Sequence, residues 1–280
     1  MTESLDDVEF VGGTVAELVE AIVAPPAAPG PDGLETFIST CPDWWGDERT
    51  FGGMVVAQAL HAASQTVPTG LHVHSLHGYF LRPAQARFPS VHKVARLRDG
   101  RSFTTREVTT AVDGRTSFRM ICSFHRAEAG DEYQLPMAGD IPAPDDAPRD
   151  EAPFPFDVRN LGATPRRDDG TYLSTRRCWF RTREPLADDP ALHACVLAYF
   201  SDMTGAAFRP HNLDSWGGYT DASLDHAVWF HRPRRADVWN IFDFQALLNA
   251  GGRSTIRATM YGEDGQLYLS MAQELLIREL

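Results

Sequence analysis

The chain has 280 residues, a net charge of −12 at pH 7 and a hydrophobic content of 43%. This length has room for two domains of typical size, and the acidic charge argues against a nucleic-acid partner, which needs basic surface. The acidic segment Met1–Asp7 lacks the apolar stretch of a signal peptide, and no uncharged apolar run approaches the roughly 18 residues of a membrane span. We therefore expect a cytoplasmic protein without a membrane span.

The first expected element is a helix over residues 14–23, where Thr14-Val-Ala-Glu17 has the capping-box pattern before apolar residues at helical spacing. Residues 24–33, rich in proline and glycine, end it and act as a linker. A second helix is expected over 50–63, in whose body only Gln58 and His61 are polar. A helix that is apolar nearly all round is buried on every side.

Strands are expected next at 72–81, 90–97, 103–112 and 115–124, with Asp113-Gly114 as a hairpin turn between the last two. Residues 126–170 are rich in Pro, Asp and Gly and indicate a connection between domains. A strand is then expected at 172–183. A second apolar helix follows over 191–202, with Asp189-Pro190 at its start and Gly205 after its end. Four more strands follow, the last at 266–276.

Landmarks of the first half recur in the second half at offsets of about 150 residues: Gly78–Pro83 with Val228–Pro233, Gly100–Phe103 with Gly252–Thr255, and Asp113-Gly114 with Asp264-Gly265. A period this long indicates two copies of a small domain rather than a solenoid. Each copy has one long apolar helix followed by strands. We therefore predict an α+β double hot-dog fold, in which two antiparallel sheets are each wrapped around a long apolar helix. The expected units are an N-terminal one at 1–125, a linker at 126–170 and a C-terminal one at 171–280.

Several segments between residue 50 and the C-terminus form a recognisable series: Phe51–Leu60, His74–Pro83, Leu97–Phe103, Tyr199–Asp202, Ser223–His226 with Trp229–Pro233, and Ala272–Glu274. In this order they resemble the two halves of the acyl-CoA thioesterase II family. The resemblance implies hydrolysis of acyl-CoA to free fatty acid and CoA without a cofactor, by a homo-oligomer. It also implies that an aspartate, a hydroxyl residue and a glutamine hold and activate the attacking water, and these fall on Asp202, Ser223 and Gln273.

Two positions depart from the family pattern. Ser223 stands where threonine is usual and keeps the hydroxyl donor and acceptor. Met54 stands where glutamine is usual, so a polar contact made there is lost.

The chemistry of a thioester suits a single positioned base. Its leaving group is a thiolate whose thiol titrates near ~8.5, so protonation on departure is not obligatory. Asp202 lies near the end of the second apolar helix, where low dielectric and the negative helix end are expected to raise its pKa and make it a better base. Strand alternation places Gln273 on the apolar face with Leu269 and Met271.

Substrate-binding residues are also expected in the first half. Gly52 and Gly53 open the first apolar helix, where free amides are expected to receive the thioester oxygen or a CoA phosphate; close helix–sheet packing is the alternative. We place Met54 with them. Arg82 and Arg232, with neighbouring arginines, are expected to line a mouth for CoA phosphates, although solvated loop charges are the alternative.

No metal is expected, because no Cys or carboxylate near His72 and His74 completes a ligand set and the four cysteines form no C-x-x-C pair. The G-x-S-x-G elbow of serine hydrolases is also absent. Two alternatives to hydrolysis stay open. One is a hydratase or dehydratase acting on acyl thioesters, which needs a His–Asp or His–Glu pair; the other is a non-catalytic acyl-CoA-binding protein.

Overall fold

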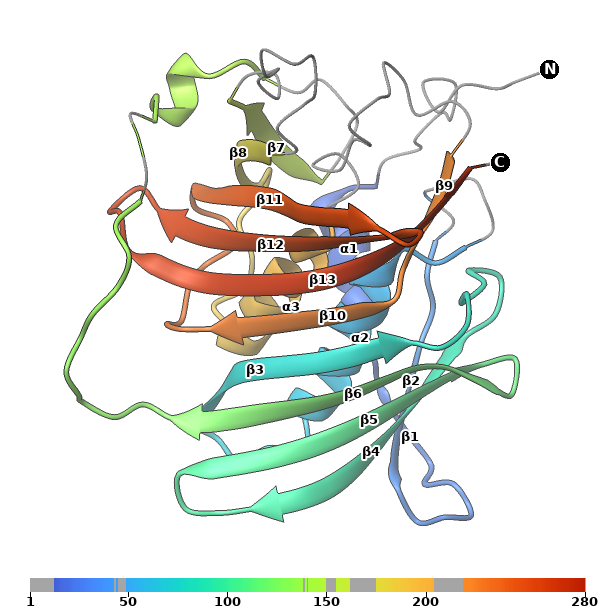
Figure 1. The fold of residues 1–280 in the computed structure, drawn as a ribbon. Coiled ribbons are helices and arrows are strands. Elements are labelled where there is room, and N and C mark those ends of the chain that lie inside the picture. The colour runs from blue at the N-terminus through green and yellow to red at the C-terminus, as the bar shows by residue number, and fades with distance from the viewer. Residues whose placement is uncertain are drawn as a thin grey trace.

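The computed structural model describes residues 13–42, 44, 49–137, 139, 141–149, 155–161, 175–203 and 219–279. It contains one large antiparallel sheet with the α-helices on one of its faces (Figure 1). The helices are α1 (Val15–Ile22), α2 (Gly52–Ser64), α3 (Pro190–Ser201) and the short 3-10 helix η2 (Pro144–Asp146). The strands are β1 (Pro26–Ala27), β2 (Glu35–Ser39), β3 (Leu71–Phe80), β4 (Ser90–Asp99), β5 (Phe103–Val112), β6 (Arg115–Arg126), β7 (Phe156–Asn160), β8 (Thr175–Thr182), β9 (Tyr219–Ser223), β10 (Asp225–Phe230), β11 (Asn240–Ala250), β12 (Arg253–Gly262) and β13 (Leu267–Glu279).

The strand order shows the duplication. It runs β1-β2-β4-β5-β6-β3-β10-β13-β12-β11-β8-β7, with β9 also paired to β13. The order β2-β4-β5-β6-β3 of the first half is thus repeated in reverse by β10-β13-β12-β11-β8. The two expected sheets are joined edge to edge, because β3 pairs with β10 from Tyr79–Asp225 to Ser75–Trp229 (Figure 1). The double hot-dog prediction is confirmed, with the two sheets as halves of one continuous sheet.

The two long apolar helices lie in the core, as their composition predicts. Nearly every side chain of α2 and all those from Leu192 to Ser201 of α3 are buried, and both helices belong to one hydrophobic cluster. Asp189 caps α3 by accepting a hydrogen bond from the Ala191 N–H at 2.9 Å, and Pro190 is the first helical residue. The helix ends at Ser201, so Asp202 is its C-cap rather than part of its body; Gly205 lies outside the described residues.

The expected hairpin and the expected capping box are both present. Asp113 (φ 48°) and Gly114 (φ 70°) occupy the left-handed region that a type I′ turn requires, between β5 and β6. At the start of α1, the Thr14 hydroxyl accepts from the Glu17 N–H and the Glu17 carboxylate accepts from the Thr14 N–H. The end of α1 is held by buried Gln58 of α2, whose Nε2 donates to the Ala21 carbonyl at 2.8 Å.

Two segments expected to be connections contain strands. Strand β1 falls within residues 24–33 and β7 within residues 126–170, and β7 pairs with β8 at the edge of the second half. Strand β2, which follows the first of these segments, pairs with β4 at the edge of the first half. These edge strands are only two to five residues long, so they show little alternation in the sequence. The unit boundaries at 125 and 171 stay predictions.

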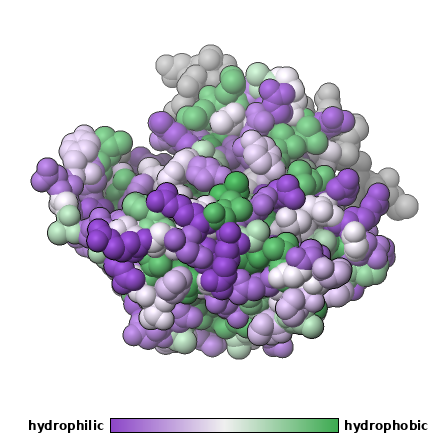
Figure 2. All heavy atoms as spheres, turned by 90° about the horizontal axis from the view of Figure 1, so that it is seen from below, coloured by the Kyte–Doolittle hydropathy of each residue, from purple (hydrophilic) through white to green (hydrophobic). Residues whose placement is uncertain are grey.

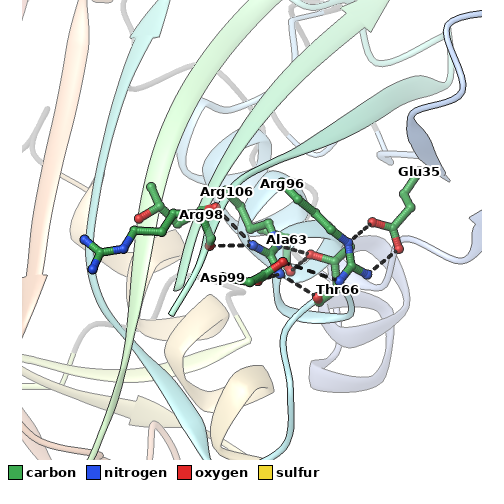
Figure 3. Close-up of polar contacts among 8 residues, drawn as sticks. Glu35, Ala63, Thr66, Arg96, Arg98, Asp99 and Arg106 are labelled. Atoms are coloured by element: carbon green, nitrogen blue, oxygen red, sulfur yellow. Dashed lines mark hydrogen bonds and ion pairs between the residues drawn. The ribbon is translucent and has the colours of Figure 1, made fainter. Parts of the chain in front are cut away.

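Arg106 on β5 fixes the C-terminal end of α2 (Figure 3). Its side chain is fully buried, and its Nε donates to the Thr66 hydroxyl at 2.8 Å. Nη2 donates to the Thr66 carbonyl at 2.9 Å and to Asp99 Oδ1 at 2.6 Å, while Nη1 donates to the Arg98 carbonyl at 3.2 Å. A buried charge is tolerated only when it is paired and its N–H groups donate to acceptors. This cluster therefore has a structural role and connects the end of α2 to the β4–β5 hairpin.

The side of the molecule seen from below the view of Figure 1 mixes hydrophilic and hydrophobic residues in small groups (Figure 2). None of the described helices is long and apolar enough to cross a membrane.

Candidate active site

The three predicted water-handling side chains come together where α3 ends against β9 and β13. Gln273 Nε2 donates to Asp202 Oδ1 at 2.6 Å and to Ser223 Oγ at 2.8 Å. Ser223 Oγ in turn donates to Asp202 Oδ1 at 3.3 Å. The pairing of β9 with β13, which sets Ser223 opposite Leu275, places Ser223 diagonally across from Gln273. Residues 71 positions apart in the chain therefore share one hydrogen-bonded cluster.

Burial controls the acidity of this cluster. Asp202 is 5% exposed and Gln273 is 2% exposed, on the strand face that also buries Leu269 and Met271. Burial raises the pKa of Asp202 to about 7, while hydrogen bonds from Gln273, the Gly53 amide and Ser223 oppose this rise. Because a general base works best with a pKa near the working pH, Asp202 has the acidity that proton abstraction at neutral pH requires.

The paired glycines allow the start of α2 to touch the end of α3. A Cβ at Gly52 would lie 2.6 Å from Asp202 Oδ2, and a Cβ at Gly53 would overlap the Tyr199 carbonyl oxygen. The Gly53 N–H donates to the Asp202 carboxylate. Close packing of helix on helix accounts for the absence of a Cβ at both positions, and ligand contact at Gly53 stays a prediction. Ligand contact at Gly52 stays a prediction.

The sequence reasoning missed His226, which lies behind Asp202. Its side chain is fully buried, its Nδ1 is 4.0 Å from Asp202 Oδ1, and its Nε2 is 2.8 Å from Ser201 Oγ. Ser201 Oγ donates to the Ala198 carbonyl, so it accepts from the His226 Nε2–H. Burial lowers the pKa of His226 to about 4, which keeps the ring neutral. His226 belongs to a motif of the family resemblance, but the motif alone did not reveal its contact with Ser201.

Asp221 is a second carboxylate that the sequence reasoning missed. It is two residues before Ser223 on β9, and its negative charge helps to raise the pKa of Asp202. Burial also raises the pKa of Asp221 itself. The signal in the sequence was the strand alternation that puts residues 221 and 223 on one face.

The structure does not bring Arg82 and Arg232 to one mouth. Arg82 follows β3 and donates to the Thr116 carbonyl at 2.8 Å, whereas Arg232 follows β10, donates to the Leu267 carbonyl at 2.8 Å and pairs with Glu132 at 3.0 Å. Because β3 and β10 are antiparallel neighbours, the residues that follow them lie at opposite ends of the pair. The predicted single basic mouth is therefore wrong for these two arginines.

Met54 is 1% exposed and packs in the hydrophobic core; its contact with substrate stays a prediction.

No group of three or more His, Cys, Asp or Glu side chains suitable for a metal occurs within the described residues. All four cysteines are free thiols, and Cys122, Cys178 and Cys195 are buried.

Comparison with known proteins identifies the family. The model of the acyl-CoA thioesterase N-terminal domain matches residues 41–125, and that of the acyl-CoA thioesterase C-terminal domain matches residues 134–277. This chain belongs to the acyl-CoA thioesterase family. It is 34% identical to Acyl-CoA thioesterase 2 of Haemophilus influenzae over 256 residues, which cover 83% of this chain and 89% of that protein. It is 30% identical to human Acyl-coenzyme A thioesterase 8 over 264 residues, covering 84% and 82% of the two chains.

Solved structures of this family agree with the fold. The acyl-CoA thioesterase II TesB2 from Mycobacterium marinum superposes with a TM-score of 0.80 at 36% identity, covering 94% of this chain and 98% of that one. The dehydratase domain of RzxB from Pseudomonas fluorescens superposes with a TM-score of 0.54 at 9% identity, covering 92% of this chain and 98% of that domain, and shares the fold alone. As an acyl-CoA thioesterase, this protein is a thioester hydrolase that cleaves acyl-CoA.

Proposed function

We propose that this acyl-CoA thioesterase works through a water molecule that Asp202 orients and deprotonates, while Ser223 and Gln273 hold the carboxylate and the water in place. The observation that carries the proposal is the meeting of these three side chains around one buried carboxylate oxygen, Asp202 Oδ1, at 2.6 Å from Gln273 and 3.3 Å from Ser223.

The two oxygens of Asp202 have different surroundings. Oδ1 accepts from both Gln273 and Ser223, whereas Oδ2 lies against Gly52, where a Cβ would be only 2.6 Å away. We assign Oδ2 as the base. A water at Oδ2 gives its proton to the carboxylate and its oxygen attacks the thioester carbonyl carbon. The C–S bond then breaks, and CoA leaves as a thiolate that takes the proton from Asp202 or from solvent.

Gln273 serves this role because its amide has two N–H donors, and both are used within the cluster. One goes to the carboxylate and the other to the Ser223 hydroxyl, so neither side chain rotates freely. The Ser223 hydroxyl is thereby fixed although serine is less restricted at χ1 than the threonine usual at this position. This arrangement supports Ser223 as a working replacement.

A second candidate reaction is hydration of an enoyl thioester, because His226 and Asp202 form the His–Asp pair that this chemistry needs. His226 is fully buried behind Asp202 and neutral, which favours a positioning role over contact with substrate.

A thiol-trapping assay with acyl-CoAs of several chain lengths tests the mechanism. We expect Asp202→Asn to lose turnover by about 10²–10⁴-fold, the usual contribution of a general base, while binding of a non-hydrolysable S-alkyl-CoA persists. Asp188→Asn, which neutralises a carboxylate whose side chain is 95% exposed, is the matched control and keeps full turnover. Substantial turnover by Asp202→Asn contradicts the assignment, and a change in enoyl absorbance without thiol release favours the hydratase.

A further inference from the structure

A large cavity lies at the end of the helix pair opposite Asp202. Its volume is about 620 Å³, within the range of about 300–1,000 Å³ that small-molecule sites occupy. Its walls come from the end of α2, the start of α3, the start of β3 and the ends of β6 and β10, through Ser64, Ala191, Ala194, Val73, Phe124 and Phe230. No role in the proposed mechanism falls on any of these residues.

The cavity exists because β3 and β10 separate at this end. Their pairing stops at Ser75–Trp229, although β3 continues with β6 as far as Leu71–Arg126. At the other end the two halves stay joined, since the Phe80 N–H donates to the Leu224 carbonyl at 3.0 Å. The opening reaches the buried face of α3, where Leu197 forms part of the wall.

The duplication relates this cavity to the active site. Ser223 faces Leu275 across β9 and β13, and at the offset of about 150 residues Val73 faces Phe124 across β3 and β6. The same offset relates Gln273 to Cys122, and Gln65 is the C-cap of α2 as Asp202 is the C-cap of α3. The cavity therefore lies where the first copy of the duplicated unit would carry its own active site.

We propose that this cavity is a second acyl-binding site, which takes the acyl chain of an acyl-CoA or of a free fatty acid and does not hydrolyse it. The proposal does not depend on the water mechanism. It relies only on acyl-CoA being the substrate class of the family.

The residues at the positions equivalent to the water-handling cluster do not repeat its chemistry. Gln65, Val73 and Cys122 stand in place of Asp202, Ser223 and Gln273, and none of them is a carboxylate. The Cys122 thiol is buried and donates a hydrogen bond to the Arg106 carbonyl at 3.8 Å, and burial raises its pKa to about 12. It is therefore not a nucleophile at neutral pH.

The lining favours an acyl chain over a phosphate group. Phe124, Phe230 and Leu197 make part of the wall apolar, and the carboxylates Glu128, Asp131 and Glu132, which also line the cavity, disfavour a phosphate. The two arginines of the lining are already occupied: Arg232 by Glu132 and the Leu267 carbonyl, and Arg234 by Asn240 and the Trp239 carbonyl, both at 2.7 Å. The polar end of an acyl group has partners nearby. His74 Nε2 is buried without a hydrogen-bond partner among the described residues, and His74 lines the cavity together with His125, whose Nε2 lies 3.7 Å from the Glu128 carboxylate.

Titration calorimetry on the full chain counts the sites. We expect two molecules of S-decyl-CoA, a non-hydrolysable thioether, to bind each wild-type chain. Ala191→Phe places a ring in the cavity from the first turn of α3 and is expected to reduce the count from two to one. Ala187→Phe, an exposed alanine of the loop before α3, is the matched control and keeps two sites. Decanoate tests whether the second site also takes free fatty acids. If decanoate competes with S-decyl-CoA at the site that Ala191→Phe removes, that site binds fatty acids as well as acyl-CoA.

Two results overturn the proposal. One is a single site that Ala191→Phe does not change. The other is a single site that Ala191→Phe abolishes together with hydrolysis, which makes the cavity part of the hydrolytic site. If circular dichroism shows that Ala191→Phe is unfolded, His74→Trp fills the cavity from β3 and is judged by the same counts. Because the ligand is not hydrolysed, an active Asp202→Asn variant would refute the water mechanism without affecting this count.

Discussion

The C-terminal ends of α2 and α3 occupy equivalent places in the two halves but have opposite chemistry. At the end of α3, the Asp202 carboxylate is buried and receives hydrogen bonds from the neutral groups of Gln273, Ser223 and Gly53. At the end of α2, the Arg106 guanidinium is buried and paired with Asp99 and Thr66 (Figure 3). One end keeps a carboxyl group whose pKa burial raises to about 7, and the other keeps a paired guanidinium.

If Asp202 acts as we propose, the duplicated fold divides stability and catalysis between its two copies. A buried carboxylate held mainly by neutral partners costs stability when it ionises, and a single small domain has little stability to spare. Here the first copy holds the end of α2 with the Arg106 cluster, while the second copy carries the destabilising carboxylate of Asp202. The shared core of α2 and α3 couples the two.

The largest expected effect concerns the stability of the Arg106 cluster. Asp99→Ala leaves a fully buried guanidinium without its carboxylate, so we expect it to lower the free energy of unfolding by about 3 kcal/mol. Arg106→Met removes the buried charge itself and leaves Asp99, which is 48% exposed, to solvent; it should cost less than Asp99→Ala. Urea unfolding measures both. A larger loss for Arg106→Met would mean that the guanidinium's hydrogen bonds, rather than its pairing, hold this end.

The next effect separates the two copies by activity. Gln273→Ala removes two hydrogen bonds, one of them to a charged group, and we expect kcat/KM to fall about 10–150-fold, because such a bond contributes about 1.5–3 kcal/mol. Cys122→Ala, the equivalent change in the first copy, should leave kcat/KM unchanged. Thiol-trapping kinetics at several acyl-CoA concentrations measure both. Equal losses would contradict the division of roles.

A third effect concerns how the free energy of unfolding depends on pH through Asp202 in the second copy. Burial raises the pKa of Asp202 to about 7 from the 3.8 of a free aspartate, so between these values the folded chain binds one proton more than the unfolded chain. Its contribution to stability is complete below pH 4 and is lost as pH rises through 7, at about 1.4 kcal/mol per pH unit. Asp202→Asn should remove this part of the slope. Urea unfolding of both proteins at pH 5, 6, 7 and 8 measures it, and parallel curves would show that Asp202 has an ordinary pKa.

The sequence was sufficient for features that depend on local pattern. The capping box at Thr14, the Asp113-Gly114 turn and the two apolar helices all follow from neighbouring residues. Gln273 could be placed on the buried strand face by alternation alone, and the family resemblance supplied its partners Asp202 and Ser223.

Features that depend on distant pairing could not be predicted. The edge-to-edge contact of β3 with β10 decides that Arg82 and Arg232 lie at opposite ends, and nothing local to either strand indicates it. The contact between His226 and Ser201 spans 25 residues for the same reason. The short strand β7 is specified by its backbone pairing with β8 rather than by an apolar pattern.

The smallest expected effect tests the electrostatics of the active end. Asp202 must be ionised to act as a base, so kcat/KM should rise with pH and level off above an inflection near 7. The charge of Asp221 is the weakest of the named influences on this pKa and raises it. Asp221→Asn should therefore move the inflection to lower pH by less than one unit, with the plateau kept. Glu107→Gln, which neutralises a carboxylate on β5 in the first copy, is the control that leaves the profile in place. A shift to higher pH, or the same shift in Glu107→Gln, would mean that Asp221 acts through the position of β9 or through overall charge rather than through its field at Asp202.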